Sequence, residues 1–151
     1  WEGQVARMTT EPLDLENLLR ELDDPEREPF DGLPGGTVMG HVHLQVADIP
    51  ETLRFYRDVM GFDEMATLGS QATFLAVGGY HHHVGANTWA SAGASPPPEG
   101  SASLRVASVV LPDSASRDKV VGQVAATGQD PEETPEGPVV RDPSGNRLLL
   151  A

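Results

Sequence analysis

Residues 37–48 read TVMGHVHLQVAD, and apolar and polar side chains alternate through most of this stretch. A period of two is typical of a β-strand with one buried face and one open face. The apolar positions are Val42, Leu44 and Val46, and the polar positions are His41, His43 and Gln45. The pattern therefore predicts a strand that carries two histidines on its open side.

A helix is predicted directly after this strand, over residues 48–60. Asp48 followed by Glu51 matches a capping box, Pro50 is tolerated in the first helical turn, and Gly61 is the expected stop. The expected apolar face consists of Leu53, Tyr56, Val59 and Met60. Three more strands follow, over residues 62–68, 72–77 and 81–89, so this part of the chain has the order βαβββ.

The same order returns after residues 90–103, a loop rich in Pro, Ala and Ser. Residues 103–113 predict a strand, and residues 114–128 predict a helix that ends at Gly128. The inward positions of this helix are Val120, Val121, Val124 and Ala125. Residues 137–142 and 147–151 predict a hairpin around the turn at 143–146, where Gly145 supplies a positive φ. Asp113 aligns with Asp48 when the halves are overlaid, which indicates a duplicated unit.

Residues 1–37 have a different pattern. Leu15, Leu18, Leu19 and Leu22 form one apolar stripe on a predicted helix, with Asp14 as its N-cap. An acidic stretch rich in Pro and Gly follows. We therefore expect a short helix that lies against another surface, then a linker, and one domain over residues 38–151. Within this domain, one module spans 38–89 and the other spans 104–151.

Composition narrows the function. The 151 residues suit one domain, and the absence of cysteine excludes disulfides and thiolate metal sites. The net charge of −13 argues against a nucleic-acid partner. Neither a membrane span nor a signal peptide is present, so a soluble, cytoplasmic protein is expected. The chain begins with Trp1, which suggests either numbering from the first ordered residue or a missing upstream part.

All five histidines lie in two short stretches, 41–43 and 81–83. In an extended chain His81 and His83 share one face and His82 takes the other. Imidazole is a ligand for Fe(II), Mn(II), Ni(II) and Zn(II), and it is an acid or base near neutral pH. The alternative is polar packing at the start of a strand, with His82 in solvent.

The paired modules, the stretch GHVHLQVADIPETLRFYRDVMGF and the closing DPSGNRLLL resemble the vicinal oxygen chelate superfamily. It includes glyoxalase I, the bleomycin-resistance proteins and the extradiol ring-cleaving dioxygenases. GGYHHHVGANTW, with TEPLDLENLL and DGLPGGT upstream, is similar to the C-terminal module of two-domain catechol-2,3-dioxygenase-like proteins. The resemblance implies an α+β fold in which paired βαβββ modules form an open, cup-shaped mixed sheet with helices outside.

The resemblance also implies a divalent metal in the cup, held by the first and last strands of each module, which chelates adjacent oxygens of the substrate. In the first module these ligand positions fall on His41 and near His83. In the second module they fall on Val106 and Leu149, which cannot bind a metal. Fe(II) is the expected ion, with Mn, Ni or Zn as alternatives. A homodimer, or a missing N-terminal module pair, would have to supply the remaining ligands.

The other residues of the site follow from the same resemblance. His43 or His81 is the acid/base candidate, and the expected pocket-lining residues are Gln45, Asn87 and Trp89. Two alternatives stay open at single residues. His41 can be bonded to a neighbour without any metal, and Trp89 can plug the mouth of the cup as part of the core.

Three functions are compatible with these residues. The first is a domain of an extradiol dioxygenase that acts on a small aromatic or vicinal-oxygen substrate. The second is a metal-free partner domain with a packing or small-molecule-binding role, suggested by Val106 and Leu149. The third is a bleomycin-type antibiotic-binding protein with an acidic groove at a dimer interface, which the net charge permits.

Overall fold

The structure is a computed structural model, and it describes residues 12–22, 29–98 and 100–151. Two four-stranded sheets form the body, with strand orders β1-β4-β3-β2 and β5-β8-β7-β6. Each sheet belongs to one βαβββ module, which confirms the predicted α+β fold and the duplication. In both modules the first strand pairs in parallel with the last strand, and its other edge has no strand partner among the described residues. The helices and strands are α1 (Leu15–Arg20), β1 (Val42–Gln45), α2 (Ile49–Leu53), η1 (Arg54–Val59), β2 (Asp63–Leu68), β3 (Ala72–Ala76), β4 (Val84–Asn87), β5 (Ala107–Val109), α3 (Ser114–Ala125), β6 (Glu132–Thr134), β7 (Gly137–Arg141) and β8 (Arg147–Leu150).

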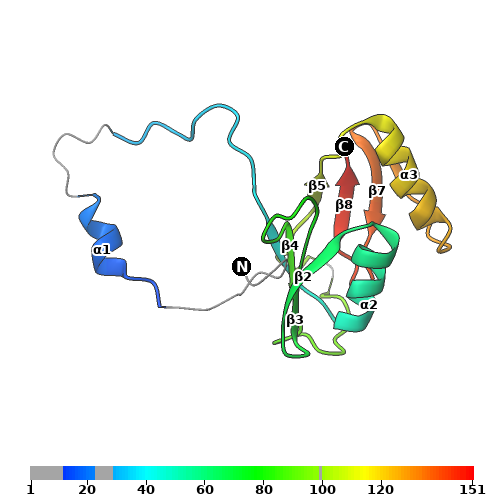
Figure 1. Cartoon of the computed structure of the whole chain (residues 1–151), viewed down its shortest axis with the longest axis horizontal. Coiled ribbons are helices and arrows are strands. Elements are labelled where there is room, and N and C mark those ends of the chain that lie inside the picture. Colours follow the sequence, from blue (N-terminus) through cyan, green and yellow to red (C-terminus); the bar gives the residue numbers. More distant parts are fainter. Residues whose placement is uncertain (1–11, 23–28, 99) are drawn as a thin grey trace.

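The two modules share one hydrophobic core on the helix-covered side of the sheets. Leu44 and Val46 of β1 belong to this core together with Leu148 and Leu150 of β8. Because side chains alternate along a strand, His43 and Gln45 lie on the opposite, helix-free side. Figure 1 shows α2 and α3 on the same side of the molecule, with α3 beside β7. The alternation predicted for β1 is therefore confirmed.

The helix caps follow the sequence closely. The Asp48 and Asp113 carboxylates accept from the backbone N–H groups of Glu51 and Ser116, each at 2.7 Å. Gly61 takes a positive φ just after the first helix, and Gly145 takes one in the β7–β8 turn. These two positions need a residue without Cβ because the left-handed region disfavours other side chains.

Several details differ from the sequence-based expectation. The helix after β1 changes from α2 to the π-helix η1, so Phe55 and Tyr56 are both buried. β6 was not predicted, because its short sequence is acidic and is followed by Pro135. Ala125 is exposed although an inward position was predicted. The strand predicted over residues 81–89 begins only at Val84 and ends at Asn87.

The helix predicted near the N-terminus is present as α1, and Asp14 caps it by accepting from the Asn17 N–H at 3.0 Å. No residue of α1 is buried, and Figure 1 shows the helix standing clear of both sheets. The expectation that it lies against another surface is therefore not met by the described part of this chain. No helix among the described residues is both long and apolar enough to span a membrane.

A buried hydrogen bond joins the two modules. The Tyr56 hydroxyl in η1 donates to the Asp142 carboxylate in the β7–β8 turn at 3.1 Å. Asp142 also accepts from the backbone N–H groups of Ser144 and Asn146 and from the Asn146 amide. Burial, and then the nearby Asp142, raise the pKa of Tyr56 well above its usual value. The neutral phenol is thus the donor in this contact, and the position of the turn is fixed by the first module.

Candidate functional site

The site begins with a pairing between β1 and β4, in which His43 lies opposite Gly85. A Cβ added to Gly85 would stand 3.2 Å from Cγ of the His43 ring, so the glycine makes room for the imidazole. An isolated glycine inside a predicted strand signals such a close approach. The sequence did not indicate this role of Gly85, because it depends on the pairing of β4 with β1.

Aromatic rings surround His43 on the helix-free side of the first sheet. The Phe74 ring lies 6.0 Å from it in an edge-on arrangement, and the Trp89 ring lies 5.8 Å away. Trp89 is 56% exposed, so the alternative in which it plugs the cup as core is wrong. We call His43, Phe74 and Trp89 the ring surface. Phe74 was not predicted as part of the site.

The triple histidine forms a second group beside the ring surface. It lies in the loop before β4, and the His82 ring is inserted between His41 at 4.6 Å and Phe74 at 5.1 Å. His82 is only 8% exposed, so its expected exposure to solvent is wrong. The Nδ1 atoms of His81 and His82 are 2.8 Å apart, which requires one of them to carry a proton and the other to accept it.

The rings of His41 and His83 have different neighbours. The neighbours of the His41 ring are His82 and, at 6.0 Å, His81. The His83 ring lies 4.7 Å from Tyr80, and its Nδ1 accepts from the Val77 N–H at 3.3 Å. The assignment of His41 and His83 as metal ligands stays a prediction.

Burial and mutual repulsion keep the central imidazoles neutral. Burial, and then the neighbouring histidines with His41 first, lower the pKa of His82 to about 4. Partial burial, and then His41, also lower the pKa of His43. Both rings are therefore uncharged at neutral pH, and each carries one N–H donor and one acceptor nitrogen. A neutral imidazole can accept a hydrogen bond or a proton from a weakly acidic hydroxyl.

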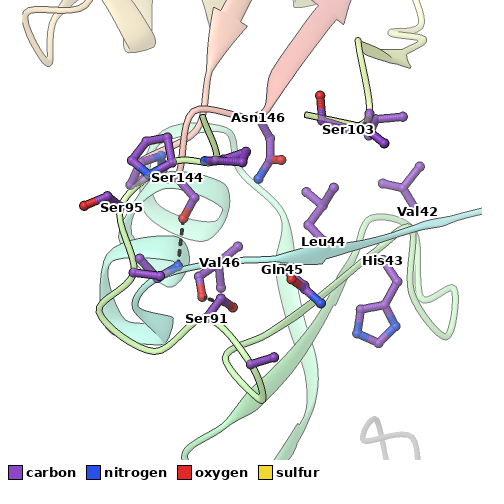
Figure 2. Close-up of a pocket in the computed structure, with 18 of the residues that line it drawn as sticks. Val42, His43, Leu44, Gln45, Val46, Ser91, Ser95, Ser103, Ser144 and Asn146 are labelled. Atoms are coloured by element: carbon purple, nitrogen blue, oxygen red, sulfur yellow. Dashed lines mark hydrogen bonds between the residues drawn. The ribbon is translucent and has the colours of Figure 1, made fainter. Parts of the chain in front are cut away.

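A cleft of about 690 Å³ runs along the free edge of β1. Its walls come from β1, from the Pro-rich loop after Trp89 and from the β7–β8 turn, where Asn146 reaches toward Leu44 (Figure 2). His41, His43 and Gln45 are among its lining residues. The Ser144 hydroxyl accepts from the Ala47 N–H at 3.0 Å. This hydrogen bond attaches the β7–β8 turn to the chain just after β1, at one end of the cleft.

Asn87, the remaining pocket-lining candidate, is buried at the end of β4. Its side-chain oxygen accepts from the Trp89 N–H at 3.2 Å. Its backbone carbonyl accepts from the Val46 N–H at 2.9 Å. Asn87 thus holds the backbone at Trp89 in place, which positions one wall of the ring surface.

The residues do not match the metal site that the resemblance implies. His43 pairs with Gly85 as Ser108 pairs with Leu149, so strand register puts Gly85 at the last-strand position of the first module. Of the four positions, which are His41, Gly85, Val106 and Leu149, a single one carries a ligand. Within residues 12–22, 29–98 and 100–151, no three or more His, Asp or Glu side chains are grouped to hold a metal ion.

Known proteins resemble this chain in sequence. The model of the Glyoxalase/Bleomycin resistance protein/Dioxygenase superfamily matches residues 38–150. The chain is 42% identical over 143 residues to the catechol-2,3-dioxygenase of Bacillus subtilis (strain 168). The match covers 94% of this chain and 49% of that protein, so the chain spans about half the length of this relative.

Solved structures show the same fold. A glyoxylase/bleomycin resistance protein/dioxygenase domain from Frankia sp. EAN1pec has a TM-score of 0.57 at 20% identity, covering 76% of this chain and 95% of that one. The lactoylglutathione lyase of Agrobacterium tumefaciens has a TM-score of 0.54 at 22% identity, covering 78% and 94%. At these identities the likeness concerns the fold.

Proposed function

Because the chain belongs to the glyoxalase/bleomycin resistance protein/dioxygenase superfamily, we propose that it is part of a ring-cleaving dioxygenase that acts on catechol-type diols. Its contribution is the surface that binds the aromatic ring. The observation that carries this proposal is the 42% identity to a catechol-2,3-dioxygenase over 94% of the chain. The ring surface provides the chemistry that such a substrate needs.

A planar diol is recognised by stacking and by hydrogen bonds to its hydroxyls. Trp89 offers an exposed aromatic face next to His43, and aromatic contacts of this kind contribute about 0.5–1.5 kcal/mol. The neutral imidazole of His43 accepts a hydrogen bond from one hydroxyl and is the group that takes its proton. His43 also lines the cleft beside β1, whereas Phe74 and Trp89 are not among the residues of its walls.

In this proposal the chain binds the aromatic ring and accepts a proton from one hydroxyl. No step of the reaction is assigned to a metal held by this chain. Oxygen chemistry on a diol would then depend on ligands from outside the four strand positions described above. His81, the other acid/base candidate, contacts His82 and Tyr80 rather than the ring surface, so His43 is the stronger candidate for this role.

Catechol binding to the purified chain tests the proposal. Tryptophan fluorescence, followed during titration with catechol, reports on Trp89, and Trp89→Phe identifies the part of the signal that comes from this residue. His43→Ala should weaken binding about tenfold, which corresponds to ~1.4 kcal/mol. Ser108→Ala, at the matching position of the second module, should leave binding unchanged. Resorcinol, whose hydroxyls are not adjacent, should bind more weakly than catechol.

Equal affinities for His43→Ala and Ser108→Ala would place the ring elsewhere and contradict the proposal. Turnover is measured separately as oxygen uptake with catechol, on the longest natural form of the protein. There His43→Ala should reduce the rate while leaving the circular dichroism spectrum unchanged. Retained folding with an unchanged rate would remove His43 from the mechanism.

A second candidate function is favoured by Val106 and Leu149. In this case the chain is a packing or small-molecule-binding lobe, and the ring is cleaved outside it. His41→Ala separates the two candidates, because His41 occupies a ligand position of the superfamily. Unchanged ring cleavage with His41→Ala and His43→Ala would favour the lobe, whereas a large loss with either variant would favour the first proposal.

A further inference from the structure

The cleft beside β1 has walls of a composition that is unusual for this chain. Within the described part of the chain, none of the residues that line it is Asp, Glu, Lys or Arg, although the chain has 23 acidic and ten basic residues. The walls carry small or apolar side chains, such as Ala94 and Leu104, and uncharged polar ones, such as Ser103 and Asn146. An ion that enters such a site loses its water without meeting an opposite charge, which is costly. The cleft therefore suits an uncharged ligand.

This cleft continues from the ring surface. His43 belongs to both, and Ala90 and Ser91, the residues directly after Trp89, line the cleft. The cleft volume of about 690 Å³ lies within the range of roughly 300–1,000 Å³ that is typical of sites for small organic molecules. An unsubstituted catechol on the ring surface leaves this volume open, whereas a side chain attached to the ring can extend past His43 into it.

Asn146 supplies a hydrogen-bond acceptor of fixed orientation in the cleft. Its Nδ2 donates to the buried Asp142 carboxylate at 2.8 Å, and because an ionised carboxylate only accepts, this bond determines which side of the amide carries the nitrogen. Figure 2 shows the side chain extending from the β7–β8 turn toward β1, with its oxygen on the side of Leu44. Among the described residues, no N–H or O–H donates to this oxygen.

The position of this acceptor is set by the first module. Asp142 accepts from the Tyr56 hydroxyl in η1, and the Ser144 hydroxyl accepts from the Ala47 N–H after β1. Both contacts hold the turn that carries Asn146. A group that is already fixed in place loses little freedom when a ligand binds, so Asn146 is well suited to select a ligand that donates a hydrogen bond.

The free edge of β1 adds backbone groups to the cleft. The N–H groups of Val42 and Val46 donate to carbonyls on the β4 side. Because the backbone groups of alternate residues in a strand face opposite edges, the N–H and C=O groups of His43 and Gln45 face the cleft. They can pair with an amide or a hydroxyl of a bound ligand.

We propose that the substrate is a catechol with an uncharged side chain, which lies in the cleft and donates a hydrogen bond from an amide or hydroxyl group to Asn146 Oδ1. This inference rests on the proposed function, because the ring surface must hold the diol. A carboxylate at the end of the same side chain is disfavoured, since it has no donor for Asn146 and brings a charge between uncharged walls. The net charge of −13 disfavours an anion further.

Isothermal titration calorimetry on the purified chain at neutral pH tests the proposed selectivity. The ligands are catechol and dihydroxyphenylpropionic acid with adjacent hydroxyls, the latter both as its amide and as its carboxylate. The amide and the carboxylate have nearly the same shape and differ in charge and in the donor. The amide should bind at least about tenfold more tightly than the carboxylate, and more tightly than catechol itself.

Substitutions in the cleft identify the groups responsible. Asn146→Ala removes the acceptor and should lower the ratio of amide affinity to catechol affinity roughly fivefold. Ser103→Lys adds a cation to an exposed part of the wall, and it should raise the affinity for the carboxylate about threefold without raising that for the amide. Gln123→Lys adds the same charge on exposed α3, outside the cleft, and should leave every affinity unchanged.

Asn146 also bonds to Asp142, so circular dichroism is recorded for Asn146→Ala to show that the chain is folded. Ser103→Lys does not touch this bond and tests the cleft independently.

Two results would overturn the inference and leave the proposed function intact. One is catechol binding that depends on His43, together with equal affinities for the amide and the carboxylate. The other is a carboxylate affinity that Ser103→Lys and Gln123→Lys change by equal amounts. If none of the ligands binds, the ring surface does not hold a diol, and the inference fails together with the proposed function.

Discussion

The first and second modules have the same fold but different side chains on their helix-free faces. His41, His43 and Gly85 in the first module correspond to Val106, Ser108 and Leu149 in the second. The first face therefore has polar rings that accept protons, and the second is mainly apolar. Since the core side of both sheets is similarly apolar, the difference shows that the fold tolerates free variation where no helix packs.

The loops before the last strand of each module, β3–β4 and β7–β8, also carry different buried polar side chains. The first holds the buried His82 and its imidazole neighbours, and the second holds Asp142. One connection supplies candidate chemistry, and the other fastens the two modules together through Tyr56. Substitutions at matched positions of the two modules measure how far this division extends.

The largest effect is expected at Asp142. Asp142→Ala removes the acceptor of four hydrogen bonds, and it leaves the buried Tyr56 hydroxyl and two backbone N–H groups unpaired. The free energy of unfolding should fall by at least about 3 kcal/mol, because each such group costs roughly 1–3 kcal/mol. Urea denaturation measures it. Asp130→Ala, at an exposed position, should have almost no effect. A loss at Asp142 as small as the one at Asp130 would show that the contact between the modules is unimportant.

The next effect is a pH dependence that comes from the first module alone. The pKa of His82 falls from 6.5 in the unfolded chain to about 4 in the folded protein, so the folded state binds fewer protons between these values. Above pH 6.5 the ring is uncharged in both states, and the free energy of unfolding does not depend on it. As the pH falls from 6.5 toward 4, the unfolded chain binds the proton more tightly, and the free energy of unfolding decreases by up to about 3 kcal/mol. His82→Phe should flatten the decrease of the urea midpoint between neutral and acidic pH, whereas His83→Gln should keep it. Parallel pH curves for His82→Phe and the unmodified chain would contradict the assignment.

A smaller effect is expected when the same substitution is made in both modules. Gly85→Ala brings a methyl group to 3.2 Å from the His43 ring, and it should cost about 1 kcal/mol and weaken catechol binding. Gly122→Ala in α3 meets no atom within 4 Å and should stabilise the chain, because alanine favours helix. Thermal unfolding of the two variants gives the signs. A stabilising Gly85→Ala would mean that the imidazole has other room.

The smallest difference is expected at the helix caps. Asp48 and Asp113 make the same 2.7 Å bond to the third residue beyond them, so Asp48→Ala and Asp113→Ala should lower Tm slightly and equally. The backbone N–H of Ser116 also lowers the pKa of Asp113. Calorimetry measures both variants, and a clearly larger loss at either cap would show that the modules differ in their helices as well as in their open faces.

Sequence patterns predicted the parts of the molecule that depend on local rules. The alternation in β1, the Asp48 and Asp113 caps and the turn at Gly145 each follow from one residue's geometry or hydrogen bonding. Elements that depend on tertiary packing were harder to predict. Examples are the switch to η1, which buries Phe55 and Tyr56, and the acidic strand β6.

The candidate site was predicted less completely than the fold. Its position at His41 and His43 follows from the strand pattern, but the burial of His82 depends on where β4 begins. A shift of the strand start by a few residues changes which imidazole meets His41. Gly85 shows the same limit, since its role depends on register with β1 rather than on its own sequence neighbours.

Because of the Tyr56–Asp142 bond, neither module can simply replace the other in this fold. At the positions that match Tyr56 and Asp142, the other module has valine: Val120 or Val121 in α3, and Val77 after β3. A crossover product with two first modules would bury a tyrosine hydroxyl without an acceptor. One with two second modules would bury a carboxylate without its phenol. The first product would leave an unpaired hydroxyl in its interior, whereas the second would keep the three bonds that Asp142 accepts within its own turn. This single hydrogen bond therefore favours the present pairing of unlike modules.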